Sequence, residues 1–344
     1  MELESSYPPL FRRLRDSAPA IDPDNGSPTA NPIPEPHPIP LIDLQRLDVE
    51  PERLGEACRE LGIFRVVNHG VPLDLLTRLR SHARRLFSLP FESKQASFTT
   101  PLSYFWATPV LTPSGSAVSR GSQSVNWVEG LQVPVGQLSL LGDGDGDDDD
   151  GDDDVVTVLA GLRSLLQEYG VHLARIAKLL FQAMADDLRL DPTHSKSYLS
   201  ESTGFIRLYR YLHCSKADGD MSGMEAHSDS SVLTILCEDD VGGLEFYKDE
   251  QWIRVQSAPD TLIVNVGDML QVMSDDKYIS VKHRVKVKKP EDRISLCYFV
   301  FPGQDSVIRS VKYRPFTYAD FQAQVQRDVK TLGFKVGLPR FKLD

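Results

Sequence analysis

The most informative segment of the chain reads Glu225-Ala226-His227-Ser228-Asp229-Ser230 and leads into the run Val232-Leu233-Thr234-Ile235-Leu236. That run is made of β-branched and apolar residues and is typical of a strand. In a strand, residues i and i+2 face the same side. We therefore expect His227 and Asp229 to share a strand and to point together into one pocket.

A second histidine is expected at the same pocket. The segment from Ser280 to Val287 alternates in the manner of a strand and contains His283. A single His-x-Asp is weak evidence, because most such residues are surface polar residues or structural histidines. Two histidines and one carboxylate on one face of a metal, with the other positions open, are the arrangement of non-haem Fe(II) oxygenases.

A third strand is predicted from Arg293 to Phe301. Its alternate members are Arg293, Ser295, Cys297 and Phe299, which we expect to face inward. A guanidinium and a hydroxyl on one face bind a carboxylate, the first through a bidentate ion pair and the second through a further hydrogen bond. The carboxylate expected here is the distal one of 2-oxoglutarate.

Several other segments follow one another in the order of a known family. They are Pro38-Ile39-Pro40-Leu41-Ile42-Asp43-Leu44, Leu61-Gly62-Ile63-Phe64-Arg65-Val66-Val67-Asn68-His69-Gly70-Val71-Pro72, Val241-Gly242-Gly243-Leu244-Glu245, Ile263-Val264-Asn265-Val266-Gly267-Asp268 and Ser280-Val281-Lys282-His283-Arg284-Val285. From Ile39 to Lys342 the chain resembles the plant-type 2-oxoglutarate- and Fe(II)-dependent dioxygenases. Within that family, its segments 127–129, 241–244 and 313–318 look most like the gibberellin oxidases, of the 2-beta-dioxygenase or 20-oxidase kind.

The resemblance implies an α+β, mainly β fold with a double-stranded β-helix (jelly roll) core buttressed by helices. Many short strands with turn signals between Arg207 and Phe301 agree with a jelly roll. The resemblance also implies an enzyme that uses Fe(II), 2-oxoglutarate and O2, with ascorbate as reductant. The implied metal ligands are His227, Asp229 and His283, and the implied 2-oxoglutarate ligands are Arg293, Ser295 and Tyr211.

One motif departs from the family pattern. Where the family carries Asn-x-Tyr-Pro-Pro-Cys, this chain reads Tyr209-Arg210-Tyr211-Leu212-His213-Cys214. Tyr211 is retained, but Tyr209 replaces the Asn. Strand alternation places Tyr209 and Tyr211 on one face, so we interpret Arg210 as outward facing. His213 is left without a role, and His69 is interpreted as a structural histidine rather than a fourth metal ligand.

The substrate pocket is less legible than the metal site. Tyr104, Trp106 and Trp127 resemble family segments that lie over the active site, and they either line the cavity or pack the lid against the core. With Phe299 they suit a bulky apolar substrate. The resemblance implies a gibberellin-type diterpenoid acid, oxidised at an aliphatic C–H with release of succinate and CO2. A flavonoid, phenylpropanoid or alkaloid substrate is the alternative, and a non-catalytic metabolite-binding protein on the same scaffold is another.

We expect one catalytic domain with added flanks. The predicted regions are a Pro-rich flexible arm (1–38), an N-terminal dioxygenase region with helices and a lid (39–140), a disordered acidic insertion (141–154), a long buttressing helix (155–200), the jelly-roll core (201–303) and a C-terminal helix and tail (304–344). Helical periodicity predicts helices at 51–61, 73–87 and 158–188, and a last helix at 318–332 capped by Thr317. The apolar stripe of the long helix contains Leu162, Leu165, Leu166, Tyr169, Leu173, Ile176, Ala177 and Leu180.

Composition sets the wider context. The chain has 344 residues and a net charge of −11, to which the run from Asp143 to Asp154 contributes nine aspartates. We interpret that run as solvated and disordered rather than as a site for calcium or a basic partner. The four cysteines have no zinc or disulfide spacing, and no apolar run has the length of a membrane span. We expect no signal peptide, because the first residues carry early acids and lack a basic start and an apolar core. We expect a cytoplasmic monomer with a small-molecule substrate and no nucleic-acid or membrane partner.

Overall fold

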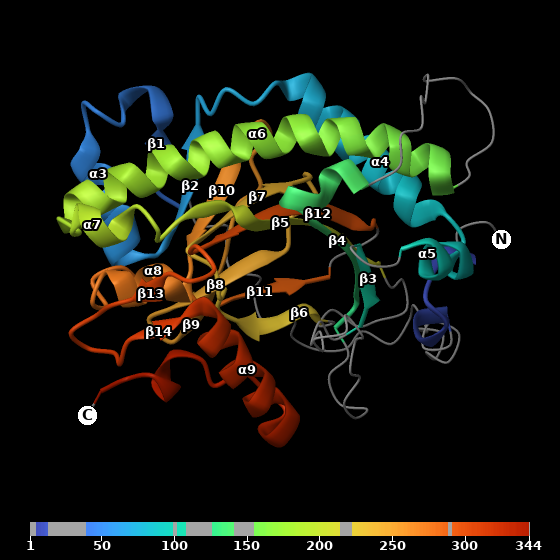
Figure 1. Ribbon diagram of the computed structural model, residues 1–344. Coiled ribbons are helices and arrows are strands. Elements are labelled where there is room, and N and C mark those ends of the chain that lie inside the picture. The colour runs from blue at the N-terminus through green and yellow to red at the C-terminus, as the bar shows by residue number, and fades with distance from the viewer. Residues whose placement is uncertain are drawn as a thin grey trace, which may run out of the picture.

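The computed structural model describes residues 5–12, 39–98, 102–107, 126–140, 155–213, 222–287 and 291–343. The acidic insertion and most of the Pro-rich arm lie outside the described residues, as does Cys214. The described part of the chain forms two β-sheets that enclose a cavity, with helices on the outer face of the larger sheet (Figure 1).

The larger sheet has eight strands. In spatial order they are β1 (Leu41–Asp43), β2 (Ile63–Val67), β10 (Leu262–Val266), β7 (Leu233–Glu238), β12 (Arg293–Phe301), β5 (Ser200–Tyr211), β4 (Val128–Pro134) and β3 (Ser103–Trp106). Apart from the parallel pair β1 and β2, the neighbours are antiparallel. The high content of Val, Ile, Leu and Phe in β7, β10 and β12 suits strands that are buried on both faces.

The smaller sheet has four strands. In spatial order they are β6 (Ser222–His227), β11 (His283–Lys286), β8 (Leu244–Lys248) and β9 (Gln251–Arg254). Side chains from both sheets share one apolar cluster, in which Met224 and Val285 of the smaller sheet meet Leu236 and Phe299 of the larger. This face-to-face packing confirms the predicted jelly-roll core and the α+β, mainly β class. A two-stranded ribbon, β13 (Val307–Ile308) and β14 (Phe316–Thr317), follows the core.

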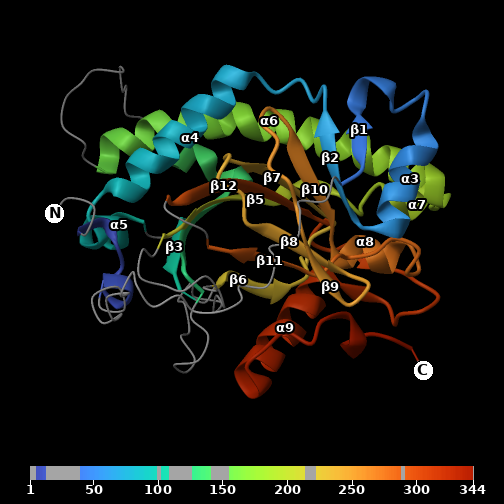
Figure 2. The ribbon, with the colours of Figure 1, turned by 180° about the vertical axis from the view of Figure 1, so that it is seen from behind.

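The helices α3 (Pro51–Glu60), α4 (Leu73–Ser88) and α6 (Val155–Leu188) cover the outer face of the larger sheet, as both views show (Figures 1 and 2). The predicted stripe of α6 is buried throughout and forms the core with the sheet. The helix ends at Leu188, because Arg189 has a left-handed φ of 54° and Asp191 then caps the short α7 (Pro192–Ser195). The predicted end of this helix at residue 188 is therefore confirmed, and the helix begins at Val155, three residues before the predicted start.

The remaining helices are α5 (Phe91–Ser97), α8 (Asp268–Met273) and α9 (Tyr318–Leu332), with short 3-10 turns at η1 (Leu44–Arg46), η2 (Val135–Leu140) and η3 (Leu338–Arg340). The bounds of α9 and its cap at Thr317 are as predicted. Thr317 Oγ1 accepts from the Asp320 N–H at 3.2 Å, and the Asp320 carboxylate accepts from the Thr317 N–H at 2.9 Å. Among the helices described, none has the length and apolar character needed to cross a membrane.

The first residues of the chain correct an expectation. Tyr7 and Phe11 are 1% and 0% exposed, and the Phe11 ring lies 4.3 Å from that of Trp127. Residues 5–12 are therefore packed into the domain and do not belong to a flexible arm. The reason lies in composition, because the two large aromatic side chains of this segment stabilise its packing through burial of apolar area.

Candidate metal centre and cosubstrate pocket

His227 and Asp229 do not share a strand, which corrects the sequence-based expectation. His227 is the last residue of β6, and Asp229 lies in the connection 228–232 that crosses from the smaller sheet to β7 in the larger one. The two side chains converge because the chain turns between the sheets, and strand alternation has no part in it. The sequence pattern predicted that the two side chains lie close together, as they do, but it predicted the wrong backbone geometry for bringing them there.

The connection 228–232 is held by the backbone at the start of α8. The N–H groups of Gly267 and Asp268 donate to the carbonyls of Val232 and Asp229 at 3.0 and 2.8 Å. Gly267 is required for this approach, because a Cβ at this position would lie 2.1 Å from the Ser231 carbonyl oxygen. The carboxylate of Asp229 is thus presented from a rigid loop.

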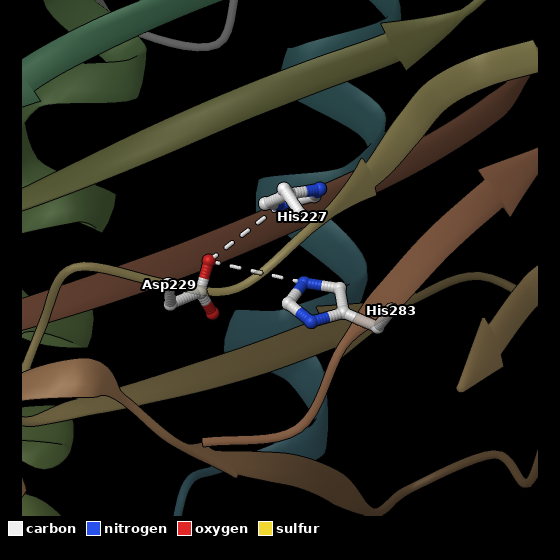
Figure 3. A group of neighbouring side chains, drawn as sticks. All are labelled: His227, Asp229 and His283. Carbon is white, nitrogen blue, oxygen red and sulfur yellow. Dashed lines mark ion pairs between the residues drawn. The ribbon is translucent and has the colours of Figure 1, made fainter. Parts of the chain in front are cut away.

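His283 completes the group from a neighbouring strand. It opens β11 and is the antiparallel partner of His227, with the two ring centroids 4.3 Å apart. Figure 3 shows both rings and the Asp229 carboxylate pointing toward one another. Asp229 Oδ1 lies 3.7 Å from His227 Nε2 and 3.8 Å from His283 Nε2. Donors about 2.1 Å from one metal lie about 3 Å apart at a right angle and about 4 Å apart when opposite, so these spacings suit a shared ion.

The protonation of both imidazoles also suits a metal. His227 Nδ1 lies 2.8 Å from the Glu225 carbonyl and His283 Nδ1 lies 3.1 Å from the Val281 carbonyl. A carbonyl only accepts, so each Nδ1 carries the hydrogen and each Nε2 presents its lone pair to the centre. Burial and the adjacent His283 lower the pKa of His227 to about 4, which keeps that ring neutral near pH 7.

Asp229 supplies the anionic member of the group. Burial alone would raise the pKa of Asp229, but the pKa lies below its ordinary value because any protonated form of the adjacent imidazoles, His283 first, attracts the carboxylate. Its Oδ2 is buried and has no hydrogen-bond partner among the described residues. Two imidazole nitrogens and one carboxylate with open positions form the donor set of a non-haem Fe(II) site, and these three residues fit it.

The group opens into a cavity between the sheets. It encloses about 430 Å³ of space free of atoms, its open mouth included. The predicted inward face of β12 is confirmed, since Arg293, Ser295, Cys297 and Phe299 all line this cavity. The other lining side chains are those of Tyr209, Tyr211, Met224, His227, Asp229, Thr234, Leu236, Leu244, Asn265, His283 and Val285.

Arg293 presents unused donors at this cavity. Its side chain is only 4% exposed, and Nη2 donates to Glu238 Oε2 at 2.8 Å. Arg293 Nε and Nη1 and the Ser295 hydroxyl are buried without a hydrogen-bond partner in the part of the chain that the structure describes. Buried donors left unpaired cost about 1–3 kcal/mol each, so an anionic ligand that accepts from them is strongly favoured.

The two tyrosines of β5 form one wall of this seat. The Tyr211 ring lies 4.9 Å from the Arg293 guanidinium carbon and stacks on Tyr209 at 5.8 Å. Burial raises the pKa of both phenols, that of Tyr209 to about 12, so both hydroxyls stay protonated and can donate. Tyr209 therefore fills the place of the family Asn with a stacked aromatic ring. Its hydroxyl accepts from Arg207 Nη1 at 3.2 Å.

The aromatic candidates for the substrate divide into two groups. Phe299 lines the cavity, whereas Tyr104, Trp106 and Trp127 are absent from its described lining. The Tyr104 hydroxyl donates to Glu129, and Trp106 and Trp127 pack on Phe11. Alternation along β3 points Phe105 the other way, and its ring meets Tyr209 edge-on at 5.7 Å. The geometry thus favours the alternative in which Tyr104, Trp106 and Trp127 pack the structure.

Arg210 lies on the face opposite the cavity, as expected, but it does not face outward. It is 3% exposed and pairs with Glu129 at 3.1 Å and with Asp292 at 2.6 Å. Lys94, also buried, donates to Glu129 at 2.8 Å. That face of β5 is covered by α4, α5 and residues 5–12, which strand alternation could not reveal. His213 joins the network through a 2.8 Å contact with Asp292.

His69 has the structural role expected of it. Its Nδ1 accepts from the Val71 N–H at 3.1 Å, and its Nε2 donates to the Asp260 carbonyl at 3.2 Å. Both ring nitrogens are thereby occupied, and the ring tethers the turn after β2 to the loop that precedes β10.

Two residues near the cavity were missed from the sequence. Glu238, the counterion of Arg293, is the β-ladder partner of Ser295, a pairing that only the register reveals. Arg207 shares the inward face of β5 with Tyr209 and Tyr211, a placement that alternation could have predicted. Its guanidinium carbon lies 4.8 Å from the Phe205 ring and 5.4 Å from the Phe299 ring, and it also donates to Gln132 at 2.8 and 2.9 Å. A cation therefore stands among aromatic rings beside the cavity.

Comparisons with known proteins agree with this site. Residues 202–302 match the family model described as the 2OG-Fe(II) oxygenase superfamily, and residues 39–137 match the one described as non-haem dioxygenase in morphine synthesis N-terminal. Gibberellin 2-beta-dioxygenase 6 of Oryza sativa subsp. japonica is 35% identical over 326 residues, covering 88% of this chain and 84% of that protein.

Two solved structures are similar across the fold. One is the dioxygenase for auxin oxidation of rice, with a TM-score of 0.68 and 26% identity, covering 89% of this chain and all of that one. The other is JOX2 in complex with 2OG, Fe and JA, with a TM-score of 0.70 and 26% identity, covering 93% and 94% of the two chains.

Proposed function

We propose, from the premise that the chain belongs to the 2OG-Fe(II) oxygenase superfamily, that it oxidises an aliphatic C–H of a gibberellin-type diterpenoid acid. The protein is an oxidoreductase of the dioxygenase type that uses Fe(II), 2-oxoglutarate and O2. In the balanced reaction one oxygen atom of O2 converts the substrate C–H to C–OH, and the other enters succinate as 2-oxoglutarate loses CO2. Ascorbate is proposed as the reductant that keeps the iron ferrous.

The proposed iron ligands are His227, Asp229 and His283. The observation that carries this assignment is the convergence of two Nε2 lone pairs on one buried carboxylate. When bound, the iron supplies the activation of O2 that is coupled to decarboxylation of 2-oxoglutarate. The residues of the chain hold the metal in a fixed geometry and leave positions open toward the cavity.

The proposed seat of the distal 2-oxoglutarate carboxylate is formed by Arg293, Ser295 and Tyr211. Arg293 Nε and Nη1 supply two charge-assisted donors and Ser295 a third. The protonated Tyr211 hydroxyl is a further donor on the same wall. The carboxylate fixed at this end orients the 2-oxo end of the molecule toward the metal ligands, and the apolar walls formed by Leu236 and Leu244 exclude water.

The acidic character of the proposed substrate is supported by Arg207. A substrate carboxylate buried near Phe299 needs a cationic partner, and Arg207 stands beside that ring. Gibberellins and auxin, which appear in the names of the relatives, are both carboxylic acids. The aromatic rings around Arg207 suit the rigid apolar skeleton that carries such a group.

A panel experiment tests the substrate. Purified protein with Fe(II), 2-oxoglutarate and ascorbate is offered equimolar gibberellins, flavonoids, phenylpropanoids and alkaloids, and products are identified by mass spectrometry as a gain of one oxygen. We expect the diterpenoid acids to be turned over first. Preferential oxidation of a planar phenolic would replace the substrate class, and no release of succinate with any substrate would favour a non-catalytic binding protein.

Substitution of Arg207 tests the recognition of the acid. Arg207→Met should raise KM for the acidic substrate at least tenfold, while KM for 2-oxoglutarate stays near the wild-type value. For the methyl ester of the same substrate, which carries no negative charge, KM should differ little between the wild type and Arg207→Met. An equal rise in KM for the acid and the ester would show that Arg207 does not recognise the substrate carboxylate.

We also propose that the protein works as a monomer in the cytoplasm, on small molecules and without a nucleic-acid or membrane partner. Cys58, Cys237 and Cys297 are free buried thiols, which agrees with a reducing compartment suited to Fe(II). Light scattering coupled to size exclusion measures the mass directly, and a dimer at micromolar concentration would overturn the monomer. A fluorescent fusion of the full chain reports the compartment.

A further inference from the structure

We propose that Lys335, in the segment after α9, is a positioning residue for the metal centre. It lies beyond the segment 202–302 that matches the oxygenase family model. Its side chain reaches back to the connection 228–232, which carries Asp229. The inference rests on the proposed metal site and adds to it a support that comes from the C-terminal part of the chain.

The contacts of Lys335 are specific. Its Nζ donates to the Ser228 carbonyl at 2.9 Å and to the Ser230 hydroxyl at 2.9 Å, on either side of Asp229. It also lies 2.6 Å from Asp268 Oδ2, in an ion pair whose side chains are 20% and 4% exposed. A single ammonium thus fixes both neighbours of a ligand and neutralises a buried carboxylate.

Asp268 extends this support to the other ligands. Its N–H donates to the Asp229 carbonyl at 2.8 Å, and its Oδ1 accepts from the Ser280 hydroxyl at 2.7 Å. Ser280 precedes Val281, whose carbonyl accepts from His283 Nδ1. The pair of Lys335 and Asp268 therefore contacts the segments that carry all three proposed ligands.

The fold presents Lys335 from a rigid base. Gly333 ends α9 with a φ of 92°, and Gly337 turns the chain again with a φ of 75°. Beyond the second turn, Arg340 pairs with Asp328 of α9 at 2.9 Å. These contacts fix the short segment between α9 and η3, so the lysine acts as a brace between two anchored elements.

Groups that orient metal ligands affect metal affinity more than overall packing does. Removing such a partner typically weakens metal binding or activity about 10- to 100-fold. We therefore expect Lys335→Met, which keeps the length of the side chain and removes the ammonium, to raise the Kd for Fe(II) by about 10- to 100-fold. Lys335→Arg retains the charge and should recover part of the affinity.

The experiment titrates Fe(II) into the metal-free full chain under anaerobic conditions, with a competing chelator, and measures the melting temperature with and without metal. The control is Lys342→Met. This lysine follows η3, its side chain is 58% exposed, and its one ion-pair contact in the described structure is a long one, 3.8 Å from Nζ to Asp276 Oδ2. We expect Lys342→Met to bind Fe(II) as the wild type does. In Lys335→Met the rise in melting temperature on adding metal should shrink, in addition to any change in the metal-free protein.

Two results separate failure of this inference from failure of the proposed function. Wild-type Fe(II) affinity in Lys335→Met, even with a lowered melting temperature, would reduce the lysine to a structural role. A wild-type protein that binds no Fe(II), or that binds it equally after His283→Ala, would overturn the metal site itself. If Lys335→Met does not fold, Ser230→Ala removes one contact and keeps the charge pair, and unchanged affinity in that variant would count against the brace.

Discussion

His227, the last residue of β6, lies directly opposite His283, the first residue of β11, in the antiparallel ladder of the smaller sheet. One strand pair therefore sets the spacing of both imidazoles. The ladder register shifts between His283 and Val285, so the regular pairing of the two histidines ends at the site. The third member, Asp229, comes from the crossing to the other sheet, and the site forms only when the two sheets are packed together.

Asp229→Ala should abolish Fe(II) binding and succinate formation and leave the fold intact. Its Oδ2 has no hydrogen-bond partner in the described structure, and its backbone carbonyl, which accepts from Asp268, is kept by the substitution. The melting temperature of the metal-free protein should equal or slightly exceed that of the wild type. Metal titration, succinate release and a thermal melt check this together, and wild-type turnover would remove Asp229 from the site.

Arg293→Leu should raise the KM for 2-oxoglutarate strongly. Loss of the cationic partner of the bound 2-oxoglutarate carboxylate costs about 2–5 kcal/mol. The substitution also leaves Glu238 without its ion-pair partner. Binding of the primary substrate, measured separately by calorimetry, should change little. Arg59→Leu, which breaks an ion pair with Asp187 far from the cavity, is the control. Weaker binding of the primary substrate with an unchanged KM for 2-oxoglutarate would show that Arg293 binds the primary substrate and not the cosubstrate.

The sequence was sufficient wherever a local pattern fixes the structure. The bounds of α9 follow from its apolar period and the cap at Thr317, and the inward face of β12 follows from alternation. The sequence was insufficient where contacts between segments that are distant in the chain determine the position of a side chain. Arg210 is buried because remote segments cover its face of β5, and Asp229 meets His227 through a sheet crossing that no periodicity records.

Gly267→Ala should weaken Fe(II) binding and lower the melting temperature. The added Cβ would stand 2.1 Å from the Ser231 carbonyl, so the connection 228–232 has to move, and Asp229 moves with it. Gly136→Ala is the matched control, because its nearest neighbour would be the Ser202 carbonyl at 3.5 Å, an ordinary contact. Equal metal affinity in the two variants would show that the loop is less tightly constrained than its hydrogen bonds indicate.

Phe11→Ala should destabilise the protein by about 3–5 kcal/mol, the usual cost of truncating a fully buried phenylalanine. The side chain packs against Trp127 and Trp106 at ring distances of 4.3 and 6.1 Å. Urea unfolding of the full chain measures the loss. Phe334→Ala is the control, since that side chain is 61% exposed. A change below 1 kcal/mol would mean that residues 5–12 contribute little to the fold.

Asp292 should make part of the stability depend on pH. Burial raises its pKa, but the hydrogen bond from His213 and the charge of Arg210 outweigh burial and lower the pKa of Asp292 to about 2. In the unfolded chain an aspartate titrates near 3.9, so the lowered pKa stabilises the fold above about pH 4. That contribution, about 2–3 kcal/mol, is lost as the pH falls from 4 toward 2.

The measurement compares the free energy of unfolding of the wild type and Asp292→Asn by urea between pH 5 and pH 2.5. The difference in free energy of unfolding between the two proteins (the gap) should be largest near pH 5. It should decrease as the pH falls, because protonation of Asp292 then removes the same charge from the wild type. Asp305→Asn, at an exposed loop position, is the control, and its gap should be small throughout. A gap for Asp292→Asn that stays constant down to pH 2.5 would show that the Arg210 and His213 contacts do not hold the carboxylate ionised.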